Sequence, residues 1–139
     1  MKQVYEEARR RGKPTGDAIS LVFVIDEAHH VCPNMRDYIS IPERCAIELR
    51  KYGFSLITCA TRPMLVSPNI IANSNTLISH MLNNADDIDA AAGFFMGGAS
   101  VKDSLRRLTV GEAMVQINSP RPLSPIRCKV SQISLIPPS

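Results

Sequence analysis

The sequence lacks tryptophan and is poor in aromatic residues, which make up 5% of its 139 residues. A surface that stacks nucleic-acid bases on aromatic rings is therefore not expected. No apolar run is long enough to cross a membrane, and the first residues, MKQVYEEARRR, lack the apolar core of a secretory signal. We expect a cytoplasmic protein that does not contact a membrane.

The four cysteines, at positions 32, 45, 59 and 128, include no Cys-x-x-Cys pair. Cys45 and Cys59 fall in a predicted helix and a predicted strand, so we expect free thiols in a reducing compartment. A zinc site made by His29, His30 and Cys32 is the weaker alternative, because its spacing matches no common zinc finger.

The excess of positive charge is also small, with a formal net charge of +3. Nucleic-acid binding through charge needs clustered cations, so this balance permits DNA binding without indicating it. With 45% hydrophobic and 21% charged residues, the composition is ordinary for a single globular domain.

A phosphate-binding loop is the most consequential absence. Such a loop follows a strand and has the pattern G-x-x-x-x-G-K-[ST]. The nearest string is residues 12–15, GKPT, where Pro14 separates the lysine from the threonine, no strand precedes and the flanking glycines are missing. We interpret this string as the turn that follows a helix over residues 3–11.

The most informative string that is present is LVFVIDEAHH, residues 21–30. Its apolar residues 21–25 predict a strand buried on both faces of a parallel sheet. The carboxyl end of such a strand faces the crevice where α/β proteins bind ligands. Asp26 is then placed to hold Mg²⁺, and Glu27 to orient or deprotonate an attacking water. This is the pattern of a Walker B strand with a catalytic glutamate; the alternative is a buried strand that ends in a solvated acidic turn.

Strands and helices alternate along the rest of the chain, which predicts an α/β fold with a mostly parallel sheet. Ser40 and Glu43 have the spacing of a capping box at the start of a helix that ends at Gly53. Further elements are expected as strands at 54–60, 77–82, 112–117 and 125–130, the last two forming a hairpin, and as helices near 86–95 and 100–108. We treat residues 1–139 as one partial domain with a core at 21–63, a helical connection at 64–110 and C-terminal strands at 111–136.

Several blocks, taken together, resemble the HerA/FtsK-type branch of RecA-like P-loop ATPases, and HerA-like proteins most closely. They occur in the family's order and spacing: LVFVIDEAHH at 21–30, IELRKYG at 47–53, CATRP at 59–63, SPNIIANSNT at 67–76 and LRRLTVGEAMV at 105–115. The first block resembles the family's Walker B strand and the third its sensor strand. Thr61 stands where the family usually has glutamine, and Leu49 where a glycine usually precedes the arginine. The family's phosphate-binding loop lies N-terminal to all of these blocks.

The resemblance implies a partial RecA-like core that uses ATP and Mg²⁺ to translocate or unwind DNA. It also implies a homo-oligomeric ring, a hexamer by family likeness, and a nuclease as a further partner. Thr61 is then the candidate sensor of the terminal phosphate. Arg50 is the candidate arginine that reaches the neighbouring subunit's nucleotide, with Arg62 as second choice; alternatively, Arg50 only complements a helix C-terminus and Arg62 braces a loop. His29 is interpreted as a structural or relay group.

Because the phosphate-binding loop is missing, we expect this chain alone to bind Mg–ATP very weakly and to have no turnover. Activity would appear when another segment supplies the loop. One alternative is a non-catalytic assembly or regulatory module, a pseudo-ATPase that keeps the fold. Another is a superfamily 2 DEAH helicase fragment, since Asp-Glu-Ala-His followed by Cys-Ala-Thr resembles motifs II and III of those enzymes. The Arg-Pro after Thr61 and the two later blocks resemble HerA-like proteins more than these helicases.

Overall fold

The computed structural model describes residues 2–12, 19 and 21–131. The chain divides into two compact units, Met1–Asn73 and Ser74–Ser139. Within the described ranges, no helix has the length and apolar character needed to cross a membrane.

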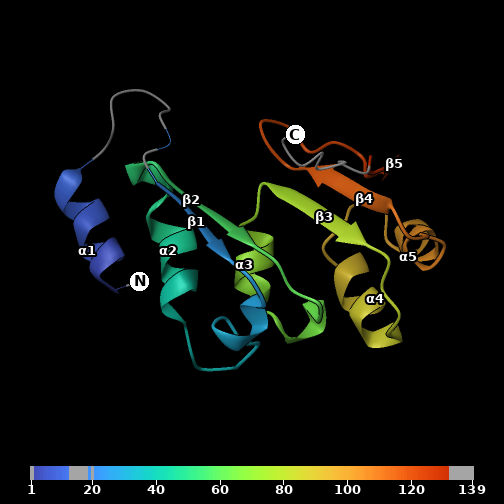
Figure 1. The fold of residues 1–139 in the computed structure, drawn as a ribbon, viewed down its shortest axis with the longest axis horizontal. Helices are drawn as coiled ribbons and strands as arrows, with labels where there is room; N and C mark the ends of the chain where they lie inside the picture. The colour runs from blue at the N-terminus through green and yellow to red at the C-terminus, as the bar shows by residue number, and fades with distance from the viewer. Residues whose placement is uncertain (1, 13–18, 20, 132–139) are drawn as a thin grey trace, which may run out of the picture. The chain divides into compact units, whose positions relative to one another are not determined.

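The first unit combines a parallel pair of strands with short helices (Figure 1). Its elements in chain order are α1 (Lys2–Arg11), β1 (Leu21–Ile25), η1 (Ala28–His30), α2 (Ile41–Glu48), η2 (Arg50–Tyr52), β2 (Phe54–Thr58), η3 (Pro63–Leu65) and α3 (Pro68–Ala72). The strands β1 and β2 run side by side in the same direction, with Leu21 opposite Phe54 and Ile25 opposite Thr58. The predicted strand at 21–25 is confirmed, and the predicted strand at 54–60 ends two residues earlier.

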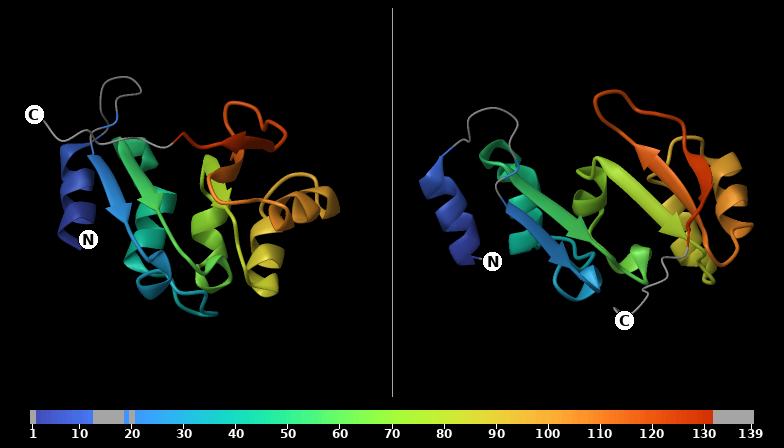
Figure 2. Two further views of the ribbon diagram at one scale, coloured as in Figure 1. Left: turned by 45° about the vertical axis from the view of Figure 1, so that its right-hand side comes forward. Right: turned by 45° about the horizontal axis from the view of Figure 1, so that its top comes forward.

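The helix α2 begins as the sequence predicts. The Ser40 hydroxyl accepts from the backbone N–H of Glu43, whose carboxylate in turn accepts from the backbone N–H of Ser40, so the capping box is confirmed. The chain then leaves α2 through η2 and stops at Gly53, whose φ of 74° is left-handed and suits glycine. Cys45 and Leu49 are fully buried and pack in one cluster with Phe54, which places α2 against β2 (Figure 2).

The two faces of the β1–β2 sheet differ in burial. On one face, Phe23 and Leu56 pack into the cluster beneath α2. On the other face, Val22, Val24 and Ile57 are 49%, 62% and 49% exposed. The prediction that the strand at 21–25 is buried on both faces is therefore wrong for this chain. Parallel sheets normally have both faces covered, and nothing in the described part of this unit covers the second one.

The second unit is an antiparallel sheet with two helices. Its elements are β3 (Thr76–His80), α4 (Ala85–Ala92), α5 (Ala99–Arg106), β4 (Glu112–Ile117) and β5 (Ile126–Lys129). The sheet has the order β3-β4-β5, so the predicted hairpin of the last two strands is confirmed. The expected strand at 77–82 exists as β3 and pairs antiparallel with β4.

One core fills the second unit. It joins α4 and α5 to the sheet through buried residues that include Ile88, Phe95, Leu105 and Met114. The exposed–half-buried alternation along β3 is that of a strand with one covered face, which antiparallel sheets tolerate. The expected class, α/β with a parallel sheet, flanking helices and a C-terminal hairpin, is confirmed; among the described strands, β1 and β2 form the parallel part.

Candidate active site

The candidate site lies where β1 and β2 end. Asp26 and Glu27 follow β1 directly, and Thr61 comes three residues after Thr58, the last residue of β2. Because the strands are parallel, their carboxyl ends share one edge of the sheet. The Thr61 hydroxyl donates a hydrogen bond of 3.0 Å to Oε2 of Glu27, and the Thr61 backbone N–H makes a long contact of 3.5 Å with the same oxygen. The fold thus brings together the predicted water-activating carboxylate and the predicted sensor.

The backbone at Glu27 is left-handed, with φ 46° and ψ 53°. A glutamate rarely adopts this conformation, which costs about 1–3 kcal/mol, and strained residues of this kind cluster at functional sites. The surrounding turn holds it in place, since the Ala28 N–H donates to the Cys59 carbonyl and the Cys59 N–H to the Ile25 carbonyl, each at 2.8 Å. Ala28 itself is fully buried. The strained residue is therefore fixed from both sides, and its carboxylate is turned toward Thr61.

Asp26 is exposed at the same edge, and its Oδ1 accepts a 2.9 Å hydrogen bond from the Glu27 backbone N–H. No three His, Cys, Asp or Glu side chains gather as a metal site anywhere in the described residues, so the structure does not build a zinc centre from His29, His30 and Cys32. A single exposed aspartate suits Mg²⁺, which takes one or two protein carboxylates and completes its shell with water and phosphate oxygens. The donor set therefore fits a magnesium ion that arrives with a nucleotide.

His29 also approaches the Glu27 carboxylate. Its Nδ1 lies 3.3 Å from Oε2, the oxygen that Thr61 contacts, although the two groups are not aligned as a hydrogen bond. The side chain is 14% exposed, and its ring lies against that of His30 with 4.2 Å between centroids. The sequence places His29 near the carboxylates, but neither the left-handed turn at Glu27 nor the approach of His29 to Oε2 has a sequence signal.

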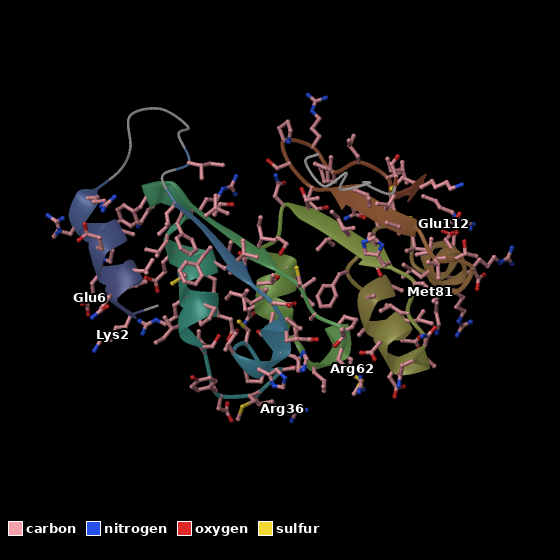
Figure 3. All side chains as sticks on the ribbon, viewed as in Figure 1. Lys2, Glu6, Arg36, Arg62, Met81 and Glu112 are labelled. Atoms are coloured by element: carbon pink, nitrogen blue, oxygen red, sulfur yellow. The ribbon has the colours of Figure 1, made fainter. Side chains whose placement is uncertain are left out.

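The two candidate arginines lie at opposite ends of β2. Arg50 begins η2, before β2, and is exposed at the amino end of the sheet, away from Glu27. Arg62 follows Thr61 and is exposed at the carboxyl end. Figure 3 shows Arg62, together with Arg36, at the end of the unit toward which the β1 and β2 arrows point. The structure therefore places Arg62 beside the candidate site and Arg50 apart from it.

A second carboxylate of this unit is saturated and buried. Glu43 is 1% exposed and accepts hydrogen bonds from the Ser40 N–H at 2.9 Å, the Ser67 hydroxyl at 2.5 Å and the Asn69 amide at 3.1 Å. Burial raises the pKa of Glu43, but these hydrogen bonds outweigh it and leave the pKa below the ordinary value. Ser67 caps α3, so this carboxylate ties the starts of α2 and α3 together. The sequence predicts the capping box but not these two partners from a distant segment.

No family model matches the chain, and no characterised protein matches it by sequence. Solved structures do match it. One is the genome packaging NTPase B204 from Sulfolobus turreted icosahedral virus 2 in complex with AMPPCP, at 14% identity and a TM-score of 0.66, over 79% of this chain and 54% of that one. The same protein in complex with AMP matches at 12% identity and a TM-score of 0.71, over 94% of this chain and 61% of that one.

The complex of B204 with ATP-gammaS matches similarly, at 14% identity and a TM-score of 0.67, over 80% of this chain and 52% of that one. The chain thus spans less than two thirds of the solved chains that it matches. At this low identity, the likeness concerns the fold alone. It shows that the chain shares the fold of part of this NTPase.

Proposed function

We propose that this chain is the Walker B and sensor half of a HerA-like ATPase that couples ATP hydrolysis to DNA translocation or unwinding. The observation that carries the proposal is the hydrogen bond between Thr61 and Glu27 at the carboxyl ends of two adjacent parallel strands. Asp26 stands next to this pair. A strand that merely ended in a solvated acidic turn would not need a left-handed glutamate aimed at a threonine of the next strand.

The residues divide the chemistry between them. Asp26 would hold Mg²⁺, whose charge offsets the negative charge of the phosphates when nucleotide is bound. Glu27 would orient or deprotonate the attacking water, and Thr61 would link that carboxylate to the terminal phosphate. Arg50 lies on the far end of the sheet from Glu27, which suits a residue that acts on a neighbouring subunit's nucleotide within a ring. Arg62 is the alternative arginine for the chain's own site.

The phosphate-binding loop must come from a segment outside residues 1–139. The open face formed by Val22, Val24 and Ile57 supports this part of the proposal, because an apolar face of a parallel sheet is normally covered. We expect the covering segment to supply the loop as well. The chain by itself should then bind Mg–ATP very weakly and show no turnover.

The first test is to read the genome around the gene for an in-frame or separate strand followed by G-x-x-x-x-G-K-[ST]. That polypeptide is then mixed with the 139-residue chain, and DNA-stimulated ATP hydrolysis is measured. We expect turnover in the mixture alone, reduced about 10²–10⁴-fold by Glu27→Gln because a general base is lost. Glu6→Gln, at an exposed residue of α1, is the control and should leave turnover unchanged. Micromolar ATP affinity of the chain alone, with hydrolysis lost in Glu27→Gln, would contradict the proposed division of the site.

The same mixture separates the other functions. A pseudo-ATPase would form stable oligomers without nucleotide and give no turnover with any phosphate-loop partner. A helicase fragment would give turnover without a ring. For the ring, mixing Arg50→Ala subunits with Glu27→Gln subunits should restore activity, since some interfaces then combine an intact Arg50 with an intact Glu27.

A further inference from the structure

We infer that His29 is a positioning residue for Glu27. The imidazole of His29 donates its Nδ1–H to Oε2 of Glu27 and thereby fixes the orientation of the carboxylate. The catalytic consequence rests on the proposed function, whereas the hydrogen bond itself does not. With Thr61 and His29 both on Oε2, that oxygen is saturated. The other oxygen, Oε1, is then the one that takes the proton of the attacking water.

The geometry has three polar groups converging on a single oxygen. The Thr61 hydroxyl lies 3.0 Å and the Thr61 backbone nitrogen 3.5 Å from Oε2, and His29 Nδ1 lies 3.3 Å from it. The Nδ1 atom is buried and has no hydrogen-bond partner among the described residues. Buried polar atoms are nearly always hydrogen-bonded, so an unpaired Nδ1 within reach of a carboxylate indicates the bond it forms.

Only a small movement is needed to form that bond. The terminal torsion of a glutamate side chain is broad, so the carboxylate turns easily at fixed position. The ring of His29 has less freedom, because it is largely buried and lies against His30. Its backbone is held by the turn that Ala28 anchors to Cys59. Rotation of the Glu27 carboxylate is therefore what completes the contact.

The hydrogen bond also decides the state of the imidazole. In a neutral histidine, one ring nitrogen carries the proton and the other accepts. A carboxylate next to Nδ1 accepts and does not donate, so the proton of His29 must reside on Nδ1. The tautomer of His29 is thus a direct readout of its contact with Glu27, and it requires neither nucleotide nor a phosphate-binding loop.

The decisive experiment is long-range ¹H–¹⁵N NMR of the full chain with ¹⁵N-labelled histidine, at about pH 8.5, where ordinary histidines are neutral. We expect His29 as the Nδ1–H tautomer in the wild type. In Glu27→Ala, its nitrogen shifts should move to those of the exposed His30, which is the internal control. An Nε2–H tautomer of His29 in the wild type would overturn the inference, and that measurement needs no variant.

Activity in the complemented mixture provides the second arm. His29→Phe keeps the ring but removes the donor, so we expect kcat to fall about 10- to 100-fold with KM unchanged, as for a misplaced catalytic group. His29→Asn retains an N–H donor at the place of Nδ1 and should recover most of that loss. Equal losses in the two variants would overturn the positioning role. If the wild-type mixture shows no turnover, the proposed function fails, and the NMR result alone decides the hydrogen bond.

Discussion

The two units of the chain bury their apolar residues in different ways. In the second unit, one core of eight buried residues lies between the helices and the sheet. In the first, two clusters of three buried residues each share the space, and the face with Val22, Val24 and Ile57 stays open. Every candidate site residue lies in the first unit. The unit with the less complete core is the one that holds polar groups and backbone strain in place, which is usual for a functional site.

The carboxylates of the two units show the same contrast. Glu43 is buried and saturated by hydrogen bonds, and Glu112 is bound by Arg127 and Thr109 on the surface of the second unit. Glu27 has a side chain that is 43% exposed, a strained backbone and polar contacts on one oxygen. Saturation marks Glu43 and Glu112 as structural, whereas the exposed oxygen of Glu27 is available to a ligand.

The largest effect is expected from a cavity in the core of the second unit. Leu105 is 1% exposed, so Leu105→Ala should lower the free energy of unfolding by about 2–5 kcal/mol. Urea unfolding measures the loss, and amide hydrogen exchange should show it most clearly in β4. Leu123→Ala, at a side chain 57% exposed, is the matched control and should change little. Equal effects of the two variants would contradict a single well-packed core.

The second largest effect on stability is expected from the polar network around Glu43 in the first unit. In Glu43→Gln, one carboxylate oxygen becomes an amide that faces hydrogen-bond donors, so the free energy of unfolding should fall by about 1.5–3 kcal/mol. Chemical denaturation of the variant and of Glu6→Gln, at an exposed residue of α1, provides the comparison. A Glu43→Gln variant no less stable than Glu6→Gln would show that the buried carboxylate does not hold α2 and α3 together.

A pH-dependent effect is expected from the surface pair of the second unit. Hydrogen bonds from Arg127 and then from Thr109 lower the pKa of Glu112 from 4.5 to about 2. Because the pKa is lower in the folded state, this carboxylate stabilises the fold above its unfolded pKa, and the contribution is lost as pH falls from 4.5 toward 2. The decrease in melting temperature between about pH 6 and about pH 3 should therefore be smaller in Glu112→Gln than in the wild type. An equal decrease in melting temperature in the two proteins would show that the Glu112–Arg127 pair does not form in solution.

The smallest effect on folding is expected at the open face. Val24 is 62% exposed, so Val24→Thr should change the free energy of unfolding of the isolated chain by no more than about 0.5 kcal/mol. In the mixture with a phosphate-loop partner, the same change should weaken association, because a hydroxyl would be buried on the covered face. Titration of the chain with the partner measures the affinity. An unaltered affinity would show that the partner does not bind on the face that contains Val24.

Much of the fold follows from short stretches of sequence. The alternation of apolar runs with capped helices predicts β1, α2 and the hairpin of β4 and β5, because strand propensity, capping boxes and turns act over a few residues. The positions of Asp26 and Glu27 at a strand end follow in the same way. The prediction that β1 is buried on both faces was wrong, because burial depends on which other segments are present to cover the sheet.

What the sequence by itself determined is the order of the elements, the type of residue at each strand end and the absence of a phosphate-binding loop within 139 residues. Only the tertiary structure decided that Thr61 and His29 meet one oxygen of Glu27, that Arg50 lies at the opposite end of β2, and that Glu43 is shared between α2 and α3. The physical reason is the range of the interactions. Periodicity and capping act between near neighbours, whereas these contacts depend on strand pairing, on a strained turn and on helix packing across distant segments.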